Sequence, residues 1–357
     1  MTLEADIIIA GAGAAGLSLA GALAHPARRV RVLVLEPRAL AANPRRWVFP
    51  AEPGHALSRH VSAEFDAVTL GGRAAPLAKV RLFHVPAQSV QDEALERIAG
   101  APDVRLEEGV RIDALVNEGK SVRLETSLGA ARARLFVETR PAGGGFVPAR
   151  AWTQIAWIAL ARDVDAAPGF TLSPAFAEAG GVGFDQTLIL PGGEALVEAV
   201  RFARPGDQGG GLEARLNARL AALGADPARV LRRRLVAPLE PSPDEGVRGA
   251  VIHARAGAGG LRFMPGVEAV RLARWSDAAA ARFASGGKIT APPGARGPAR
   301  AAARRLMRRL EHGADPGALW LNAMLARLSP DAGLRFLAGA PGWRASPALF
   351  APSQKSA

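Results

Sequence analysis

The first 36 residues carry a pattern of apolar and polar positions that predicts a strand, a helix and a second strand. Residues 6–10 begin with Asp6 and continue as three consecutive isoleucines and an alanine, which is typical of a strand buried on both faces. Small and apolar residues over 14–24 predict a helix, and the apolar run 30–35 predicts the next strand. This order is that of a βαβ unit, so the chain is expected to open with a parallel α/β fold.

The turn between the first strand and the helix has the sequence Gly11-Ala12-Gly13-Ala14-Ala15-Gly16. In a dinucleotide-binding turn, Gly11 permits the tight bend, Gly13 lets the backbone approach a diphosphate, and Gly16 lets the helix pack close to the strand. The helix N-terminus then offers N–H groups and its positive dipole end to the phosphates. Glu36 ends the second strand, where a carboxylate can accept hydrogen bonds from an adenosine ribose. The order of these features favours a dinucleotide site over an ordinary glycine-rich turn.

Later patterns predict a second lobe and a helical tail. Alternation predicts strands at 104–107, 121–126 and 133–140, whereas the proline- and arginine-containing segment 43–53 predicts a loop. An apolar, aromatic run over 152–160 and a strand pair at 187–191 and 194–200 begin a different region. The expected parts are a dinucleotide-binding domain (1–150, with 60–90 contributing to the substrate lobe), a substrate lobe (151–240), a return to the first domain (241–290) and a helical tail (291–357).

Composition excludes several kinds of chemistry. The 357 residues include no cysteine, so disulfides and thiolate catalysis are excluded and the cytoplasm is the expected compartment. The six histidines show no paired metal-ligand spacing, so no metal site is predicted. No apolar stretch approaches the length of a membrane-spanning helix.

The net charge of +12 arises from 41 arginines against 4 lysines. Two clusters stand out, at 232–234 and 300–309. The second predicts a basic helix with Leu306, Met307 and Leu310 available to an apolar face. An anionic membrane surface at the inner face of the cell membrane is therefore a candidate partner, and a solvated helix face is the alternative. No nucleic acid partner is predicted, because no nucleic-acid-binding motif accompanies either cluster.

Several segments resemble known flavoproteins. Residues 6–36 are similar to the start of FAD-dependent oxidoreductases of the aromatic-hydroxylase and reductase type, and later segments resemble the bacterial lycopene β-cyclase family. Those segments are Asn43-Pro44-Arg45-Arg46-Trp47-Val48-Phe49, Val137-Glu138-Thr139-Arg140, Leu188-Ile189-Leu190-Pro191 with the strand Glu194 to Phe202, and Gly260-Leu261-Arg262-Phe263-Met264-Pro265-Gly266. The resemblance implies an α/β fold: a Rossmann-type FAD-binding domain, glutathione-reductase-like, with an inserted β-rich substrate lobe and a helical C-terminal tail. It also implies that FAD is held by Gly11, Gly13, Gly16, Glu36, Arg140, Pro265 and Gly266.

The sequence departs from this family at positions that carry its chemistry. The acidic pair of the family's strand is reduced to Glu198, because Ala199 stands where Asp or Glu is usual. Met264 replaces a histidine, and the Gly-Tyr pair that should follow is missing. The family's Glu-x-Gly segment is lost at 234–238. Cofactor binding is therefore expected to outlast the catalytic residues of the family.

The resemblance implies a reaction without net redox change, in which the ψ-ends of lycopene are cyclised to β-ionone rings in carotenoid biosynthesis. An alkene is a very poor base, so the proton donor for such a polyene must be a carboxylic acid kept neutral in an apolar site, or a reduced flavin. Glu198 is the predicted acid. Glu194 lies four residues earlier on the same strand face, and like-charge repulsion between the two is expected to raise one pKa. Two solvated acids on a surface hairpin are the alternative.

The expected cofactors are FAD in its reduced form and NAD(P)H as the reductant that keeps it reduced. Two other functions stay open. An FAD-dependent monooxygenase or hydroxylase on an apolar substrate would consume oxygen and reduced nicotinamide, whereas the cyclase would consume neither stoichiometrically. A catalytically silent flavoprotein relative would bind FAD and turn over no polyene, and Ala199 and the missing Gly-Tyr pair leave this alternative open.

Overall fold

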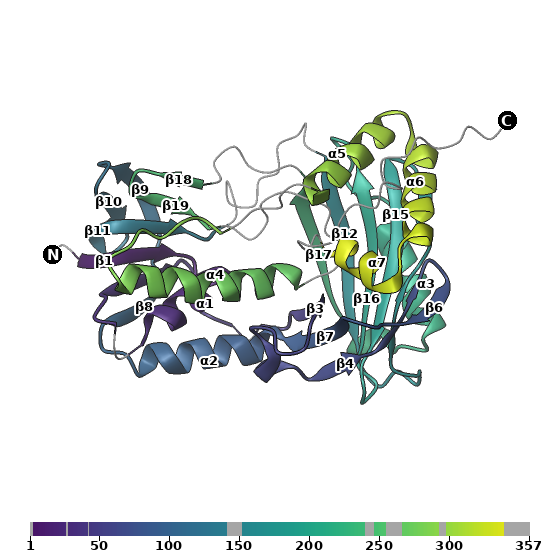
Figure 1. Cartoon of the computed structure of the whole chain (residues 1–357), viewed down its shortest axis with the longest axis horizontal. Helices are drawn as coiled ribbons and strands as arrows, with labels where there is room; N and C mark the ends of the chain where they lie inside the picture. Colours follow the sequence, from purple (N-terminus) through teal and green to yellow (C-terminus); the bar gives the residue numbers. More distant parts are fainter. Residues whose placement is uncertain are drawn as a thin grey trace.

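Two eight-stranded sheets and one three-stranded sheet make up the fold in the computed structural model (Figure 1). The structure describes residues 3–25, 28–41, 43–140, 152–239, 246–254, 266–292 and 298–338. The two large sheets lie at opposite ends of the molecule in this view, and each has its own helices. The predicted α/β fold is confirmed in this arrangement.

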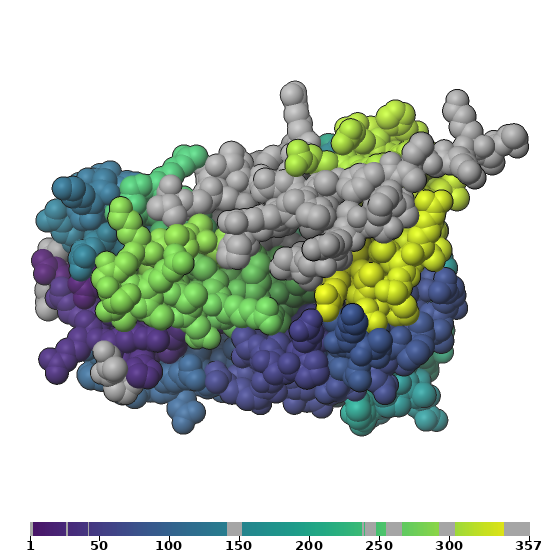
Figure 2. Space-filling view, viewed as in Figure 1, coloured from purple at the N-terminus to yellow at the C-terminus, as the bar shows by residue number. Residues whose placement is uncertain are grey.

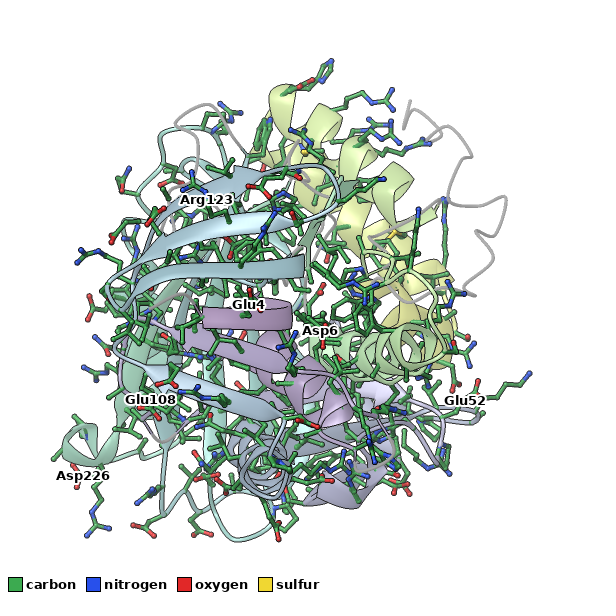
Figure 3. The ribbon with its side chains drawn as sticks, turned by 90° about the vertical axis from the view of Figure 1, so that its left-hand side faces the viewer. Glu4, Asp6, Glu52, Glu108, Arg123 and Asp226 are labelled. Carbon is green, nitrogen blue, oxygen red and sulfur yellow. The ribbon has the colours of Figure 1, made fainter. Side chains whose placement is uncertain are left out.

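The N-terminal sheet is built around β1 (Leu3–Ala10), whose three isoleucines are fully buried. β1 pairs in parallel with β2 (Val32–Glu36) and with β11 (Gly129–Glu138). The sheet is extended in parallel by β8 (Val104–Glu108) and β19 (Val251–His253), and antiparallel by β9 (Ile112–Asn117), β10 (Val122–Thr126) and β18 (Gly246–Arg248). Glu4 and Asp6 of β1, Glu108 of β8 and Arg123 of β10 mark these strands in Figure 3, seen from the end of the molecule that carries them.

Three helices cover one face of the N-terminal sheet: α1 (Ala14–Leu23), α2 (Ala87–Ala99) and α4 (Val267–Ala284). Apolar side chains from all three share one core with β1 and β2, because each helix turns its apolar face to the sheet. The space-filling view shows α4 in green over this end and the last helices in yellow at the other (Figure 2). The first strand, the glycine-containing turn and α1 therefore lie in a rigid, well-packed frame.

The second large sheet runs in the order β17-β12-β16-β15-β13-β5-β6, with β14 paired to β15. Its members are β5 (Ala67–Leu70), β6 (Arg73–Pro76), β12 (Thr153–Ala161), β13 (Gly169–Leu172), β14 (Phe176–Glu178), β15 (Gly181–Ile189), β16 (Ala195–Ala203) and β17 (Leu231–Pro238). The pairing among β17, β12, β16 and β15 is antiparallel throughout. Successive side chains of a strand face opposite sides, so β12 and β16 each contribute to two cores.

One face of this second sheet packs against α3 (Leu212–Ala222), and the other against α5 (Pro298–Glu311), α6 (Ala314–Arg327) and α7 (Pro330–Leu337). The second face also meets the three-stranded sheet of β3 (Arg46–Ala51), β7 (Arg81–Pro86) and β4 (Ala63–Phe65), which supplies Val48 and Leu82 to the same core. Short 3-10 turns lie at Ser58–His60 and Pro227–Arg229. We call the face covered by α5 to α7 the inner face.

The basic C-terminal stretch forms the predicted helix, α5. Leu306, Met307 and Leu310 are buried in the core of the inner face, whereas Arg304 and Arg308 are exposed. These three apolar side chains are the basis for interpreting this segment as a membrane-binding helix. They pack against the protein itself. In the described part of the chain, no helix is both long and apolar enough to cross a membrane.

Two segments differ from the sequence expectation. The predicted loop at 43–53 contains strand β3, because Trp47 and Phe49 fill one core while Val48 fills another, and edge pairing with β7 tolerates Pro50. The arginine cluster at 232–234 lies in an edge strand, β17. Charged side chains fit there because both faces of β17 are largely open to solvent.

Candidate active site

The three glycines of the first turn have different surroundings. Gly11 adopts φ +99°, and a Cβ there would lie 2.9 Å from both Arg140 Cγ and Thr139 Oγ1. A Cβ on Gly16 would lie 1.9 Å from the carbonyl oxygen of Gly11. A Cβ on Gly13 would meet no protein atom within 4 Å. Gly11 and Gly16 are therefore required by the packing of the chain, whereas the space over Gly13 is open to a ligand.

Glu36 is fixed against this turn. Its Oε2 accepts a hydrogen bond from the backbone N–H of Ala12 at 2.8 Å, and its Oε1 accepts one from the N–H of Arg38 at 3.3 Å. The carboxylate thus lies beside the N-terminus of α1, at the carboxyl end of β2, as the sequence predicts. Backbone N–H groups, a helix dipole and a neighbouring carboxylate suit a ligand that carries a diphosphate and a ribose.

Arg140 lies beside this turn, and Gly266 lies against β3. Arg140 donates to both carboxylate oxygens of Glu138 at 2.9 and 2.7 Å, and this hydrogen bonding raises the pKa of Arg140. Gly266 adopts φ +107° before α4, and a Cβ there would lie 2.5 Å from Trp47 Cβ. Both residues therefore have packing roles here. Pro265 lies outside the described residues.

Glu198 is buried on the inner face, with 3% of its surface exposed. Leu196 and Val200 flank it on β16 and are buried in the same core. Gln186 of the neighbouring strand β15 donates from Nε2 to Glu198 Oε2 at 2.6 Å. Burial raises the pKa of Glu198 to about 7, against the opposing effects of Arg233 and Gln186. With a pKa of about 7, about half of this carboxyl is protonated at pH 7, so it can act as an acid there.

A row of four side chains crosses the sheet at Glu198. The strand register places Arg233 of β17 opposite Ile158 of β12, Ile158 opposite Glu198, and Glu198 opposite Gln186. Burial lowers the pKa of Arg233, and Glu198 opposes that change. Neither polar neighbour of Glu198 can be recognised from the sequence, because strand order, and not sequence spacing, brings them together.

Glu194 lies just before β16 and is not a partner of Glu198. Arg46 Nε and Nη2 donate to its two carboxylate oxygens at 3.1 and 3.0 Å. The raised pKa of Glu198 therefore has burial as its cause, and the expected like-charge repulsion from Glu194 is not among the causes. The two predicted acids therefore have different surroundings: Glu198 is buried and Glu194 is ion-paired.

His84 adds a buried imidazole at the three-stranded sheet. Its side chain is on the face that carries Val48 and Leu82, and only 2% of it is exposed. Its Nδ1 lies 2.6 Å from Ser62 Oγ, and burial, reinforced by Arg46, lowers its pKa to about 4. His84 is therefore neutral at pH 7. Among the described residues, no group of three or more His, Asp or Glu side chains could hold a metal ion.

Solved structures with the same fold are enzymes of several activities. A p-nitrophenol 4-monooxygenase from Pseudomonas putida matches with a TM-score of 0.60 and 17% identity, over 94% of this chain and 92% of its own. An aromatic hydroxylase from angucycline biosynthesis matches with a TM-score of 0.60 and 21% identity, over 94% and 75%. A myxobacterial chondrochloren halogenase, described as a variant of FAD-dependent halogenases, matches with a TM-score of 0.52 and 15% identity, over 79% and 74%. These likenesses confirm the Rossmann-type fold.

The sequence comparisons are more specific. No curated protein matches the chain. The family model described as lycopene cyclase protein matches residues 6–341, which is nearly the whole sequence and includes the glycine-containing turn, Glu194 and Glu198. The chain belongs to the lycopene cyclase protein family.

Proposed function

We propose that FAD binds at the N-terminal turn. The fit rests on the open space over Gly13, the N-terminus of α1 behind it, and the carboxylate of Glu36 beside it. Gly11 and Gly16 shape the turn, and Arg140 packs against Gly11 while paired to Glu138. The description of one structural neighbour as a variant of FAD-dependent halogenases supports the same cofactor.

We infer that the reaction is a lycopene cyclase-type isomerisation, with Glu198 as the acid. The carboxyl of Glu198 gives its proton to the terminal double bond of a lycopene ψ-end, which forms a tertiary carbocation. An internal double bond attacks that cation and closes a six-membered ring. The ring then loses a proton to the Glu198 carboxylate, which forms the β-ionone ring and restores the acid. Protons and electrons balance, so the polyene is isomerised and nothing is oxidised.

The surroundings of Glu198 suit this chemistry. Ile158, Leu196 and Val200 surround it with buried apolar surface, which keeps the acid neutral and excludes water that would quench a cation. Reduced FAD bound at the first turn, with NAD(P)H as its reductant, would supply an electron-rich neighbour for the positive charge. Both oxygens of the Glu194 carboxylate are held by Arg46, so this group is suited to electrostatic stabilisation rather than to proton donation.

The missing second acid at Ala199 does not weaken this proposal. Successive residues of a strand face opposite sides, and Ala199 belongs to the apolar core beneath α3. An acid at that position would not share a face with Glu198. The observation that carries the proposal is therefore the buried carboxyl of Glu198, with its raised pKa, in a chain of the lycopene cyclase family.

Expression in cells that accumulate lycopene tests the proposal directly. We expect wild type to convert lycopene into cyclised carotenoids, Glu198→Gln to abolish this, and Glu213→Gln to leave it unchanged. Glu213 is an exposed acid of α3 and serves as the matched control. Unchanged lycopene with folded, flavin-containing wild type would overturn the proposed reaction. A colourless protein that takes up no added FAD would overturn the proposed cofactor.

A flavin-dependent hydroxylase is the second candidate, and two structural neighbours are a monooxygenase and an aromatic hydroxylase. It differs from the cyclase in stoichiometry. A hydroxylase consumes one oxygen and one reduced nicotinamide per product, whereas the cyclase needs nicotinamide only to keep the flavin reduced. Product formation from lycopene under nitrogen, with pre-reduced flavin, would exclude the hydroxylase.

A further inference from the structure

We propose that Gln186 is a positioning residue for Glu198: its amide holds Oε2, so that the acid carries its proton on Oε1 and presents that oxygen to the polyene. This inference rests on the cyclase reaction proposed above. It assigns a function to a residue that does not contact the N-terminal turn and that no sequence motif singled out.

The contact between the two side chains is set by the sheet. Gln186 and Glu198 are direct cross-strand partners in the antiparallel pair β15 and β16. They share a face, Gln186 is 4% exposed and Glu198 is 3% exposed, and the Nε2 to Oε2 distance is 2.6 Å. Both residues lie in the middle of long strands, so the sheet holds their backbones in register.

The hydrogen bond determines which oxygen holds the proton. An amide N–H can only donate, so the oxygen that faces it must accept, and the carbonyl oxygen of a neutral carboxyl does this best. The hydroxyl of neutral Glu198 therefore resides on Oε1. In the described part of the chain, Oε1 of Glu198 is buried and has no hydrogen-bond partner. A buried O–H without a competing acceptor is poised to protonate a weak base such as an alkene.

The orientation of the amide matters for the same reason. If Gln186 turned its carbonyl oxygen toward Glu198, that oxygen would accept the carboxyl proton and hold it away from the substrate. With Nε2 toward Glu198, Oε1 of Gln186 is buried without a hydrogen-bond partner among the described residues. Leaving such an acceptor unpaired costs free energy, which is typical of a polar group retained for its function.

The other charged groups on this face either lower the pKa of Glu198, as the amide does, or are paired with an opposite charge. Arg233 of β17 favours the ionised form of Glu198, as does the Gln186 hydrogen bond. Arg46 and Glu194 neutralise each other, and His84 of β7 is uncharged near pH 7. Gln186 is thus the neutral group in direct contact with the acid, and its loss should change the titration of Glu198 without adding or removing a charge.

The test uses Gln186→Met, which keeps the side-chain length and removes the amide, and Gln186→Asn, which keeps an amide that is too short to reach. Gln154→Met is the matched control, since Gln154 is a buried glutamine on β12 at the other end of this face. The protonation of Glu198 is followed in the purified full-length protein by its carboxylic C=O infrared band, identified as the band lost in Glu198→Gln. Cyclised product is measured over the same pH range.

We expect both Gln186 variants to raise the infrared midpoint of Glu198 by about one pH unit or more, because a hydrogen bond to the ionised form is lost. We expect the pH profile of cyclisation to move with it and its maximum to fall about tenfold, whereas Gln154→Met changes neither. The inference would be overturned if the Gln186 variants left the midpoint unchanged. It would also be overturned if Gln154→Met lowered product formation as much as the Gln186 variants do at every pH. The infrared titration needs no turnover. If wild type cyclises nothing, the positioning role falls with the reaction even when the midpoint moves.

Discussion

Arg46 holds Glu194 with two parallel hydrogen bonds, of 3.1 and 3.0 Å, and this pair joins the three-stranded sheet to the large sheet that carries Glu198. Both side chains are largely buried. We predict that Arg46→Met lowers the free energy of unfolding by about 3 kcal/mol, because it leaves the Glu194 carboxylate without its counter-ion. The double variant Arg46→Met with Glu194→Gln should recover part of this loss in chemical denaturation. Additive effects in that double-mutant cycle would contradict the coupling.

Because Glu194 is paired with Arg46, we predict that Glu194→Gln does not change the pKa of Glu198. Burial is the first cause of that raised pKa, and Glu194 is not among the causes. The infrared midpoint of Glu198 should therefore coincide in wild type and in Glu194→Gln. A midpoint that falls in the variant would restore like-charge repulsion as the explanation.

Arg233 has the opposite effect on Glu198. Its guanidinium favours the ionised carboxylate across Ile158, so Arg233→Met should raise the pKa of Glu198 further, by about one unit. The high-pH limb of cyclisation should move upward by the same amount. Arg232→Met is the control, because Arg232 is exposed and lies on the opposite face of β17. A downward shift with Arg233→Met, or an equal shift in both variants, would refute this assignment.

Substitutions of two glycines in the first turn should have different effects, one on the stability of the fold and the other on the affinity for FAD. Gly16→Ala would place a methyl group 1.9 Å from a backbone oxygen, so it should destabilise the fold by about 3 kcal/mol or more. Gly13→Ala meets no protein atom within 4 Å and has an allowed φ of −78°, so its melting temperature without FAD should stay close to that of wild type. Its affinity for FAD should fall about tenfold or more, since the methyl group occupies the space proposed for the diphosphate. Flavin fluorescence titration measures this, and equal affinities would place the diphosphate elsewhere.

The sequence was sufficient for the features that depend on local spacing. Gly11, Gly13, Gly16 and Glu36 lie within one βαβ unit, so their arrangement follows from the order of strand, turn and helix. Glu198 could be chosen from its strand and its family, but its partners could not. Gln186 precedes it by twelve residues and Arg233 follows it by 35, and only the strand order brings both to one face. The proline-containing β3 was missed because its burial comes from two separate cores that no local pattern reveals.

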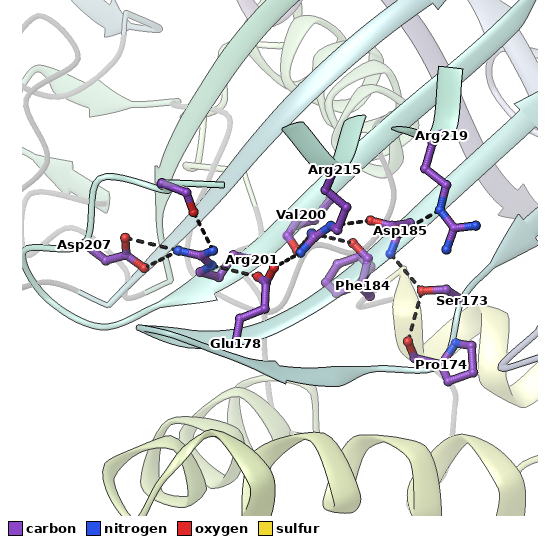
Figure 4. Close-up of polar contacts among 11 residues, drawn as sticks. Ser173, Pro174, Glu178, Phe184, Asp185, Val200, Arg201, Asp207, Arg215 and Arg219 are labelled. Atoms are coloured by element: carbon purple, nitrogen blue, oxygen red, sulfur yellow. Dashed lines mark hydrogen bonds and ion pairs between the residues drawn. The ribbon is translucent and has the colours of Figure 1, made fainter. Parts of the chain in front are cut away.

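A buried ion network stabilises the opposite side of the same sheet (Figure 4). Arg201 of β16 is 5% exposed and donates to Glu178 at 2.8 Å and to Asp207 at 3.0 Å. Asp185 accepts from Arg215 at 2.7 Å and from Arg219 at 2.9 Å, and Arg215 also pairs with Glu178. The network thereby joins β14, β15, β16 and α3 behind the strand that carries Glu198.

Arg201→Met should lower the free energy of unfolding by about 4 kcal/mol, because Asp207 loses its ion-pair partner and Glu178 keeps only Arg215. Arg229→Met removes an exposed pair with Asp163 and should cost less than about 1 kcal/mol. Both values are measured by urea denaturation of the full chain. Equal losses of unfolding free energy in the two variants would show that the buried ion pairs of Arg201 contribute no more to stability than an exposed pair.

Glu198 and His84 should act in opposite directions on the pH dependence of stability. The pKa of Glu198 rises from 4.5 to about 7 on folding, so its contribution to stability is present below pH 4.5 and is lost as the pH rises toward 7. The pKa of His84 falls from 6.5 to about 4, so its contribution is present above pH 6.5 and is lost as the pH falls toward 4. Between these limits the two losses largely cancel, and wild type should show a shallow profile.

Glu198→Gln removes the contribution of Glu198 to the pH dependence of stability, so the contribution of His84 should become measurable. Relative to wild type, its free energy of unfolding should increase with pH between 4.5 and about 7, by about 3 kcal/mol in all, and then stay constant. His84→Gln, which keeps a polar partner for Ser62, should gain stability relative to wild type as the pH falls from 6.5 toward 4. Urea denaturation at a series of pH values measures both, with Glu213→Gln as the control expected to run parallel to wild type. A difference between Glu198→Gln and wild type that is constant with pH would mean that Glu198 titrates as an ordinary carboxyl, and it would then lack the protonated form that an acid for an alkene requires.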